Sequence, residues 1–148
     1  MYSPDLMSVN RHFDPWRTMI TTESTPRPYV TIARNGRVAI QLDAPVAKGG
    51  GGEGFGSHDL LEASVAVCIN MAVRMYAAAN GIALVAVSTR VELAKSDAAT
   101  TQFIYSLELE GELTPGQKAA LHEAARTCPV RQTLSRRIEF QQADDARS

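Results

Sequence analysis

The stretch that organises this chain is Ser57–Asn80, SHDLLEASVAVCINMAVRMYAAAN, with a cysteine near its middle. Apolar or small side chains recur in it at spacings of three and four residues, which is the pattern of one helix face. That face consists of Leu61, Ser64, Val65, Cys68, Met71, Ala72 and Met75. The pattern predicts a helix of about 22 residues, roughly 33 Å long. We expect this helix to form the spine of the core and to hold Cys68 on its packed face.

The two ends of this predicted helix carry capping signals. Either Ser57 or a capping box of Asp59 and Glu62 would open it, and Gly81 stands where a left-handed C-terminal cap would lie. A membrane-spanning helix is the alternative, because the run is rich in alanine and valine. Glu62, Asn70 and Arg74 interrupt the run on one stripe, and charged groups in mid-bilayer are costly. The residues therefore favour a buried helix of a soluble protein.

Length and composition limit the class of protein. The chain has 148 residues, 45% of them hydrophobic and 21% charged, which suits one globular domain with a real core. A formal net charge of -1 leaves no basic field to hold nucleic acid or an anionic membrane. The start of the chain has no apolar segment typical of a secretory signal. Two cysteines without such a signal indicate the reducing cytoplasm, where a cysteine is either an inert core residue or a reactive one.

The first half of the chain predicts an arm, a hairpin and a loop. Residues 1–26 are polar and interrupted by prolines, so we expect an arm with one short strand around residues 18–22, followed by a single domain over residues 27–148. Strand-like runs at residues 29–32 and 38–42 flank Asn35-Gly36, a strong hairpin signal. Residues 49–56 contain a formal G-x-G-x-x-G. A mobile connector is favoured over a dinucleotide-binding turn, because a hairpin precedes it and no βαβ unit follows.

The second half predicts a second hairpin, helices and a last strand. Residues 85–93 and 103–110 alternate apolar and polar side chains with period two. Thr114-Pro115-Gly-Gln117 opens a helix to about residue 127, Pro129 suits the start of a short helix to about residue 136, and residues 138–140 predict a short strand. The order gives an α+β fold. The first hairpin cannot stay folded in water on its own, so another part of the protein must cover it. The long apolar helix also has more apolar surface than one small sheet can cover. We therefore expect an interlocked homodimer.

Two cysteines are the main candidates for chemistry. Cys68 is either a small buried hydrophobe or a reactive thiol. Cys128 precedes Pro129, where free amides and the helix dipole favour a thiolate, although it can equally just end a helix. The histidines lack metal-binding spacing and no hydrolase elbow is present, so neither a metal nor a cofactor is predicted. His58 faces either a pocket or solvent, and we expect His122 to face solvent.

Three segments together resemble the OsmC/Ohr family of bacterial osmotically induced and organic-hydroperoxide-resistance proteins. They are Gly56-Ser-His-Asp-Leu-Leu-Glu-Ala-Ser-Val-Ala-Val-Cys68, Met71-Ala-Val-Arg-Met-Tyr-Ala77 and Ala124-Ala-Arg-Thr-Cys-Pro-Val130, with Leu134-Ser135 after them. The resemblance covers roughly residues 27–140. It implies an intertwined α+β homodimer and thiol-dependent reduction of organic hydroperoxides at the dimer interface, with an external dithiol, such as a lipoyl protein, as reductant. A non-catalytic dimer that binds a small apolar ligand at that interface is the alternative.

The resemblance also implies roles for particular residues. Cys68 corresponds to the family's peroxidatic cysteine and Cys128 to its resolving cysteine. Arg27 corresponds to an arginine that favours the thiolate and binds peroxide, with Arg17, Arg34 and Arg37 as open alternatives. His58 stands where better-studied members carry a glutamate that pairs with that arginine. His58 could help to stabilise the thiolate only when it is protonated. The replacement of the glutamate by His58 affects the charge relay to the arginine and leaves the two-thiol chemistry in place.

Overall fold

The computed structural model describes residues 19–95 and 97–142. The chain divides into two compact units, Met1–Gly56 and Ser57–Ser148, each described here by itself. Arg17 and most of the expected arm lie outside the described residues. The expectation of a single domain over residues 27–148 stays a prediction.

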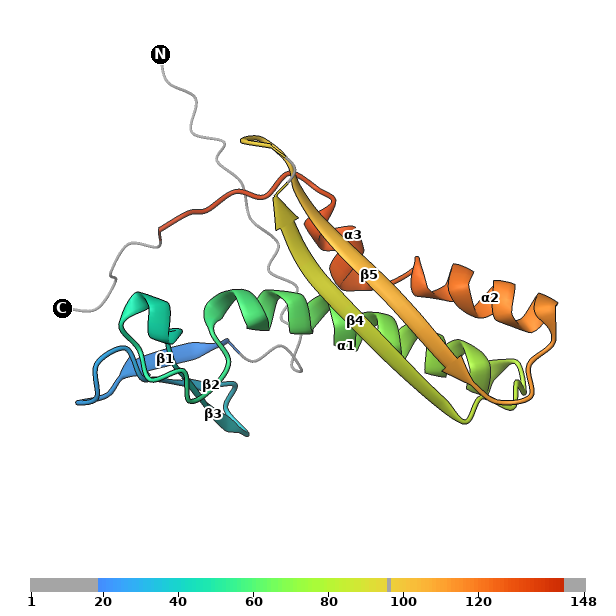
Figure 1. The fold of residues 1–148 in the computed structure, drawn as a ribbon, viewed down its shortest axis with the longest axis horizontal. Helices are drawn as coiled ribbons and strands as arrows, with labels where there is room; N and C mark the ends of the chain where they lie inside the picture. Colours follow the sequence, from blue (N-terminus) through green and yellow to red (C-terminus); the bar gives the residue numbers. More distant parts are fainter. Residues whose placement is uncertain (1–18, 96, 143–148) are drawn as a thin grey trace, which may run out of the picture. The chain divides into compact units, whose positions relative to one another are not determined.

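The first unit contains a three-stranded antiparallel sheet in the order β1-β2-β3 (Figure 1). Its strands are β1 (Thr21–Ser24), β2 (Thr31–Arg34) and β3 (Ala39–Leu42). The Asn35 side chain accepts hydrogen bonds from the amides of Arg37 and Val38, and Gly36 adopts a φ of 85°. The antiparallel pairing of β2 with β3 confirms the predicted hairpin, and Gly36 provides the positive φ that its tight turn requires. β1 overlaps the short strand predicted around residues 18–22.

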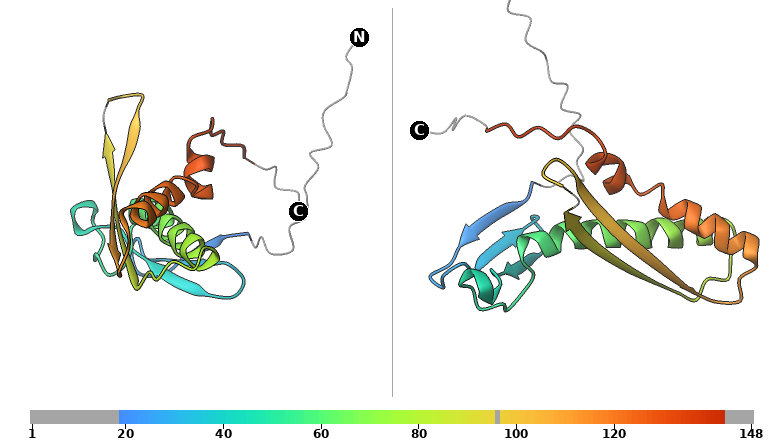
Figure 2. Two further views of the ribbon diagram at one scale, coloured as in Figure 1. Left: turned by 90° about the vertical axis from the view of Figure 1, so that its right-hand side faces the viewer. Right: turned by 45° about the horizontal axis from the view of Figure 1, so that its top comes forward.

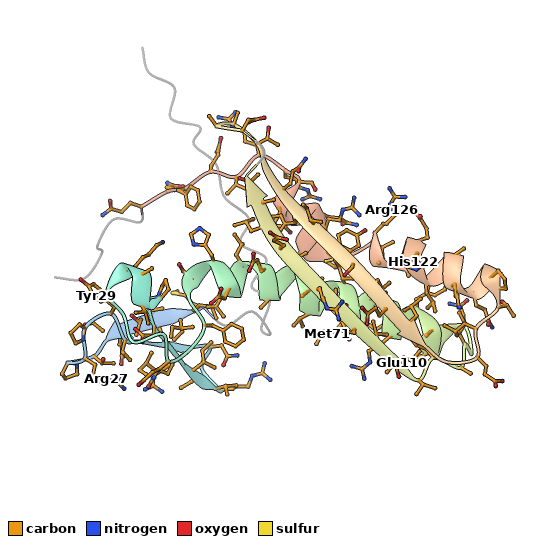
Figure 3. All side chains as sticks on the ribbon, viewed as in Figure 1. Arg27, Tyr29, Met71, Glu110, His122 and Arg126 are labelled. Atoms are coloured by element: carbon orange, nitrogen blue, oxygen red, sulfur yellow. The ribbon has the colours of Figure 1, made fainter. Side chains whose placement is uncertain are left out.

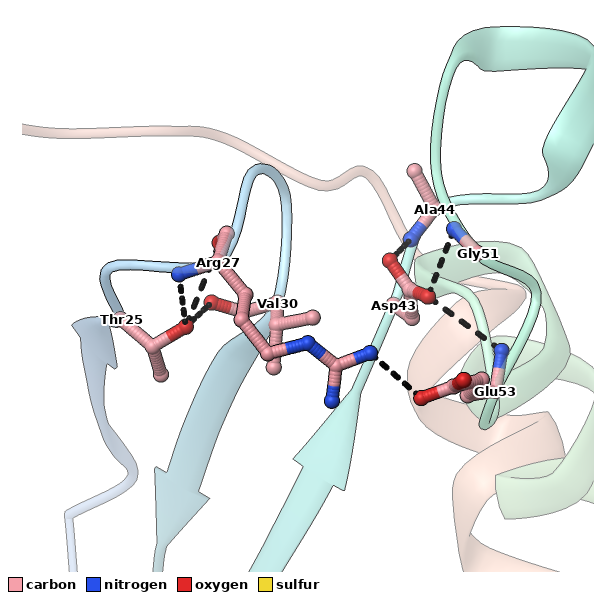
Figure 4. Close-up of polar contacts among 7 residues, drawn as sticks. All are labelled: Thr25, Arg27, Val30, Asp43, Ala44, Gly51 and Glu53. Atoms are coloured by element: carbon pink, nitrogen blue, oxygen red, sulfur yellow. Dashed lines mark hydrogen bonds and ion pairs between the residues drawn. The ribbon is translucent and has the colours of Figure 1, made fainter.

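The glycine loop that follows η1 (Val46–Lys48) folds around one buried carboxylate, Asp43 (Figure 4). Asp43 accepts hydrogen bonds from the backbone amides of Ala44 at 2.8 Å, Gly51 at 2.9 Å and Glu53 at 3.3 Å. Gly50 has no room for a side chain, because a Cβ there would lie 1.9 Å from the carbonyl oxygen of Ala44. The expected mobile connector is thus a loop with specific hydrogen bonds, and its glycines permit the close backbone approach.

Asp43 makes the stability of this loop depend on pH. Desolvation alone would raise the pKa of Asp43, but the three amides and the nearby Arg27 lower the pKa below its ordinary value. A depressed pKa means that the folded state favours the carboxylate. Its contribution is therefore present at neutral pH and is lost as pH falls below about 4, through the depressed pKa.

We predict that Asp43→Asn lowers the melting temperature at pH 7, because the new amide group turns donors toward the donors of Gly51 and Glu53. The difference from the native chain should shrink as pH is lowered through about 4, where Asp43 is itself protonated in the unfolded chain. Thermal melting followed by circular dichroism at both pH values measures this. Glu23→Gln, an exposed carboxylate on β1, is the matched control and should melt like the native chain. An Asp43→Asn difference that is the same at both pH values would contradict the prediction.

The second unit is built on α1 (Ser57–Ala79), which matches the predicted long helix. The antiparallel hairpin of β4 (Ala86–Lys95) and β5 (Thr101–Glu110) crosses α1, and α2 (Pro115–Ala125) and α3 (Pro129–Leu134) also contact it (Figures 1 and 2). Thr114 and Gln117 form the predicted capping box of α2. Ile138–Phe140 forms no strand, so that prediction is wrong: residues 138–140 are exposed and pair with no strand edge in the described part of the chain.

The face of α1 that packs within the chain differs from the predicted one. The buried stripe is Val65, Ile69, Val73 and Ala77, and it joins Leu121, Ala125 and Cys128 in one core under the half-buried face of the β4–β5 hairpin. Only Val65 belongs to both the predicted and the observed stripe. The prediction failed because α1 is apolar on more than one side, so periodicity alone does not select the side that packs.

Two polar side chains fasten α1 to β4. A carboxylate oxygen of Glu62 accepts a hydrogen bond from the amide of Leu93 at 2.6 Å, and the Asn70 side chain donates to the carbonyl of Val87 at 3.0 Å. Glu62 is therefore occupied away from Asp59, and the suggested capping box is wrong. By length and composition alone α1 would also pass as a membrane span, a property that core helices of soluble proteins share.

Candidate active site

Cys128 is the N-cap residue of α3 and is completely buried. Its Sγ accepts a hydrogen bond from the backbone amide of Arg131 at 3.4 Å. Burial raises the pKa of the Cys128 thiol and its hydrogen bond with Cys68 raises it further, whereas the amides of Arg131 and Val130 lower it. The net pKa lies above the ordinary value, so the amides at the helix start, which the sequence suggested would favour a thiolate, are outweighed by desolvation.

The structure brings the two cysteines together. Cys68 lies in the middle of α1, where it packs against the core cluster as expected but is only half-buried. Its side chain lies close enough to that of Cys128, a member of the core cluster, to raise the pKa of the Cys128 thiol, and neither cysteine is in a disulfide. Two thiols in contact are the arrangement that a disulfide requires.

Cys68 opens onto an apolar groove of about 900 Å³, here called the Cys68 groove. It is lined by Leu60, Ala63, Ser64, Val67, Cys68, Met71, Ala72, Met75, Tyr76, Thr127, Pro129 and Val130. Most of the side chains predicted to pack in the core line this groove, and two of them are exposed within one chain, Met71 by 52% and Met75 by 70%. Cys68 thus stands at the boundary between the core and an uncovered apolar surface.

Arg27 belongs to the first unit, where it pairs with Glu53 of the glycine loop (Figure 4). Its Nη2 lies 2.5 Å from a carboxylate oxygen of Glu53, and both side chains are more than half exposed. The hydrogen bond and charge of Glu53 raise the pKa of Arg27 above its ordinary value. Sequence reasoning missed Glu53, since nothing in a glycine-rich run indicates a contact across 26 residues. The predicted role of Arg27 at Cys68 stays a prediction.

The remaining candidates lie apart from the pair of thiols. His58 is exposed in the first turn of α1, ten residues before Cys68 and thus about 15 Å along the helix axis. His58 therefore lies too far along α1 to touch Cys68 of its own chain, and its predicted role in the site stays a prediction. His122 is exposed on α2, as expected (Figure 3). Arg34 ends β2 and Arg37 follows the hairpin turn. The described residues hold no cluster of side chains suited to a metal.

Comparison with known proteins decides the family. A family profile described as OsmC-like protein matches residues 50–142, which is more than half of the chain. The chain belongs to the OsmC-like family. The resemblance drawn from its sequence is thereby confirmed. No curated protein matches the chain in sequence.

Solved structures of OsmC-like proteins show the same fold. A Psychrobacter arcticus protein named for osmotic stress induction and detoxification superposes with a TM-score of 0.67 at 24% identity, covering 78% of this chain and 87% of its own. An OsmC-like protein of Mycoplasma pneumoniae gives 0.66 at 18% identity, covering 80% and 86%. An organic hydroperoxide resistance protein of Legionella pneumophila gives 0.56 at 21% identity, covering 79% and 89%. The predicted α+β fold class is confirmed.

Proposed function

We propose that this OsmC-like protein is a thiol peroxidase that reduces organic hydroperoxides with Cys68 and Cys128. The observation that carries the proposal is the contact between the two thiols beside an apolar groove. An apolar groove suits the organic part of a hydroperoxide better than it suits hydrogen peroxide. The family's association with organic hydroperoxide resistance supports the same substrate class.

The proposed reaction has three steps. The Cys68 thiolate attacks one peroxide oxygen, the O–O bond breaks, and the products are Cys68 sulfenic acid and an alkoxide, which takes a proton to become an alcohol. The Cys128 thiolate then attacks the sulfenic sulfur, so a disulfide forms and hydroxide leaves as water after protonation. An external dithiol, for example a lipoyl protein, reduces the disulfide by exchange and is itself oxidised.

The working form in this proposal is a cytoplasmic homodimer that contacts neither membrane nor nucleic acid. The exposed Met71 and Met75 support it, because soluble proteins rarely leave a large apolar groove uncovered. Arg27, paired with Glu53, would stabilise the Cys68 thiolate and bind peroxide oxygen. Glu53 would then replace the carboxylate that the family carries at the position of His58.

Peroxide consumption tests this function. With cumene hydroperoxide and a dithiol, the native protein should turn over many times, and Cys68→Ser should fall to the uncatalysed background. Arg27→Ala should slow turnover by about tenfold or more, the size of one lost charge-assisted contact. Arg90→Ala, which removes another exposed arginine paired with a glutamate, is the matched control and should leave the rate unchanged.

The alternative is a non-catalytic dimer that binds a small apolar ligand, and the size of the Cys68 groove is the observation that favours it. The same assay separates the two. Native protein that consumes no more peroxide than Cys68→Ser would overturn the peroxidase and leave the binding function.

A further inference from the structure

The guanidinium of Arg131 has one buried nitrogen without a partner among the described residues. Its Nη1 is buried and makes no hydrogen bond in the described part of the chain. The ion pairs among those residues involve Arg27, Arg90, Arg126 and Arg137 instead. Arg131 as a whole is half-buried, but a guanidinium stays protonated in proteins, and a buried N–H group without an acceptor is unfavourable. Arg131 therefore needs an acceptor.

A second pocket provides the place for that acceptor. It measures about 500 Å³, within the range of small-molecule sites. Arg131 lines it together with Val65, Ile69, Phe103, Tyr105 and Leu134, so the rest of the wall is chiefly apolar. We call it the Arg131 pocket. It shares no lining residue with the Cys68 groove, and it is formed by α1, β5 and the α3 segment of one unit.

The two features together specify the chemistry of a ligand. The planar fork of a guanidinium matches the two oxygens of a carboxylate. A small inorganic anion would satisfy the charge but would leave the apolar walls in contact with water. A neutral apolar molecule would fill the walls but would leave Nη1 unpaired.

We propose that the Arg131 pocket binds an organic monocarboxylate with an apolar tail, the carboxylate pairing with Arg131 and the tail lying against Ile69 and Phe103. This site is separate from the peroxide chemistry, so it stands or falls independently of the proposed function. Its ligand class is that of medium-chain fatty acids.

Isothermal titration of the 148-residue chain with octanoate and with octan-1-ol tests the proposal. Octanoate should bind once per chain and about tenfold or more tighter than octan-1-ol, which has the tail without the charge. Arg131→Gln should weaken octanoate by a similar factor and leave octan-1-ol unchanged, and Arg131→Lys should restore part of the difference. Arg126→Gln, at an exposed arginine paired with Glu123, is the matched control and should bind like the native protein (Figure 3).

Three outcomes would overturn the proposal. Equal affinities for octanoate and octan-1-ol would show that the pocket does not recognise the negative charge of the carboxylate. Octanoate binding that Arg131→Gln leaves intact would place the ligand elsewhere, for example in the Cys68 groove. Finally, Asp144 and Asp145 are acidic residues of the chain's own C-terminal segment. A double Asp144→Asn, Asp145→Asn variant that binds octanoate about tenfold tighter would identify that segment, rather than a separate ligand, as the partner of Arg131.

Discussion

Met71→Asp should convert a particle of twice the 16.0 kDa chain mass into single chains. Met71 lines the Cys68 groove and is half exposed in one chain. In the proposed homodimer a second chain covers this groove. A two-fold interface uses each residue twice, and each Met71 has about half of its surface left to bury, so losing both removes about 1.5–3 kcal/mol before the cost of two buried carboxylates is added.

Sedimentation velocity at micromolar concentration measures this change. Val85→Asp is the matched control, because it introduces the same charge at an apolar residue that is 77% exposed and lies outside the groove. The control should sediment at twice the chain mass. Native protein that sediments as a folded monomer would refute the homodimer, and Met71→Asp that keeps the doubled mass would show that the groove is not the interface.

Local signals account for the parts of the fold that sequence predicted well. The bounds of α1 follow from a sustained helical period that ends at Gly81, which adopts the expected positive φ of 62°. The turn at Asn35-Gly36 and the capping box at Thr114 are likewise decided by residues within a few positions of each other. Such features need no knowledge of the rest of the chain.

Features that depend on distant partners were not predictable. Glu62 resembled half of a capping box, yet its carboxylate binds an amide 31 residues away. Residues 138–140 have strand-forming side chains, but a strand requires a free edge to pair with. The packed side of α1 was misjudged for a related reason: the apolar side that includes Met71 and Met75 is the one expected to meet a second chain. In the proposed homodimer its composition would resemble that of a core, because an obligate interface is itself a core.

The pairing of the two cysteines depends both on the local sequence around each one and on a contact between distant parts of the chain. Their sequence contexts left a reactive pair open, and only the family resemblance predicted one, because 60 residues of separation give no geometric constraint. The contact between them makes the second step of the proposed cycle testable. The step requires a Cys128 thiolate, since the thiolate is the nucleophile in disulfide formation.

One equivalent of cumene hydroperoxide should produce an intramolecular Cys68–Cys128 disulfide in the native protein, and Cys128→Ser should instead retain a sulfenic acid on Cys68 that dimedone traps. Burial holds the pKa of Cys128 above its ordinary value, so at neutral pH this thiol is mostly protonated. Below that pKa the thiolate fraction grows about tenfold per pH unit, and the lifetime of the sulfenic acid should fall accordingly as pH rises from 7 to 8.

Quenched single-turnover oxidation followed by non-reducing peptide mapping measures both the cross-link and the surviving sulfenic acid. Timing begins once the sulfenic acid has formed, so the pH dependence of the first step does not enter. Cys128→Ser is the control. Without the resolving thiol, the lifetime of the Cys68 sulfenic acid should no longer shorten as pH rises from 7 to 8. Thiols that both stay free under peroxide, or Cys68 that proceeds to sulfinic acid while Cys128 remains reduced, would show that Cys128 does not resolve the intermediate, because a thiol in contact with a sulfenic sulfur should condense with it before a second peroxide arrives.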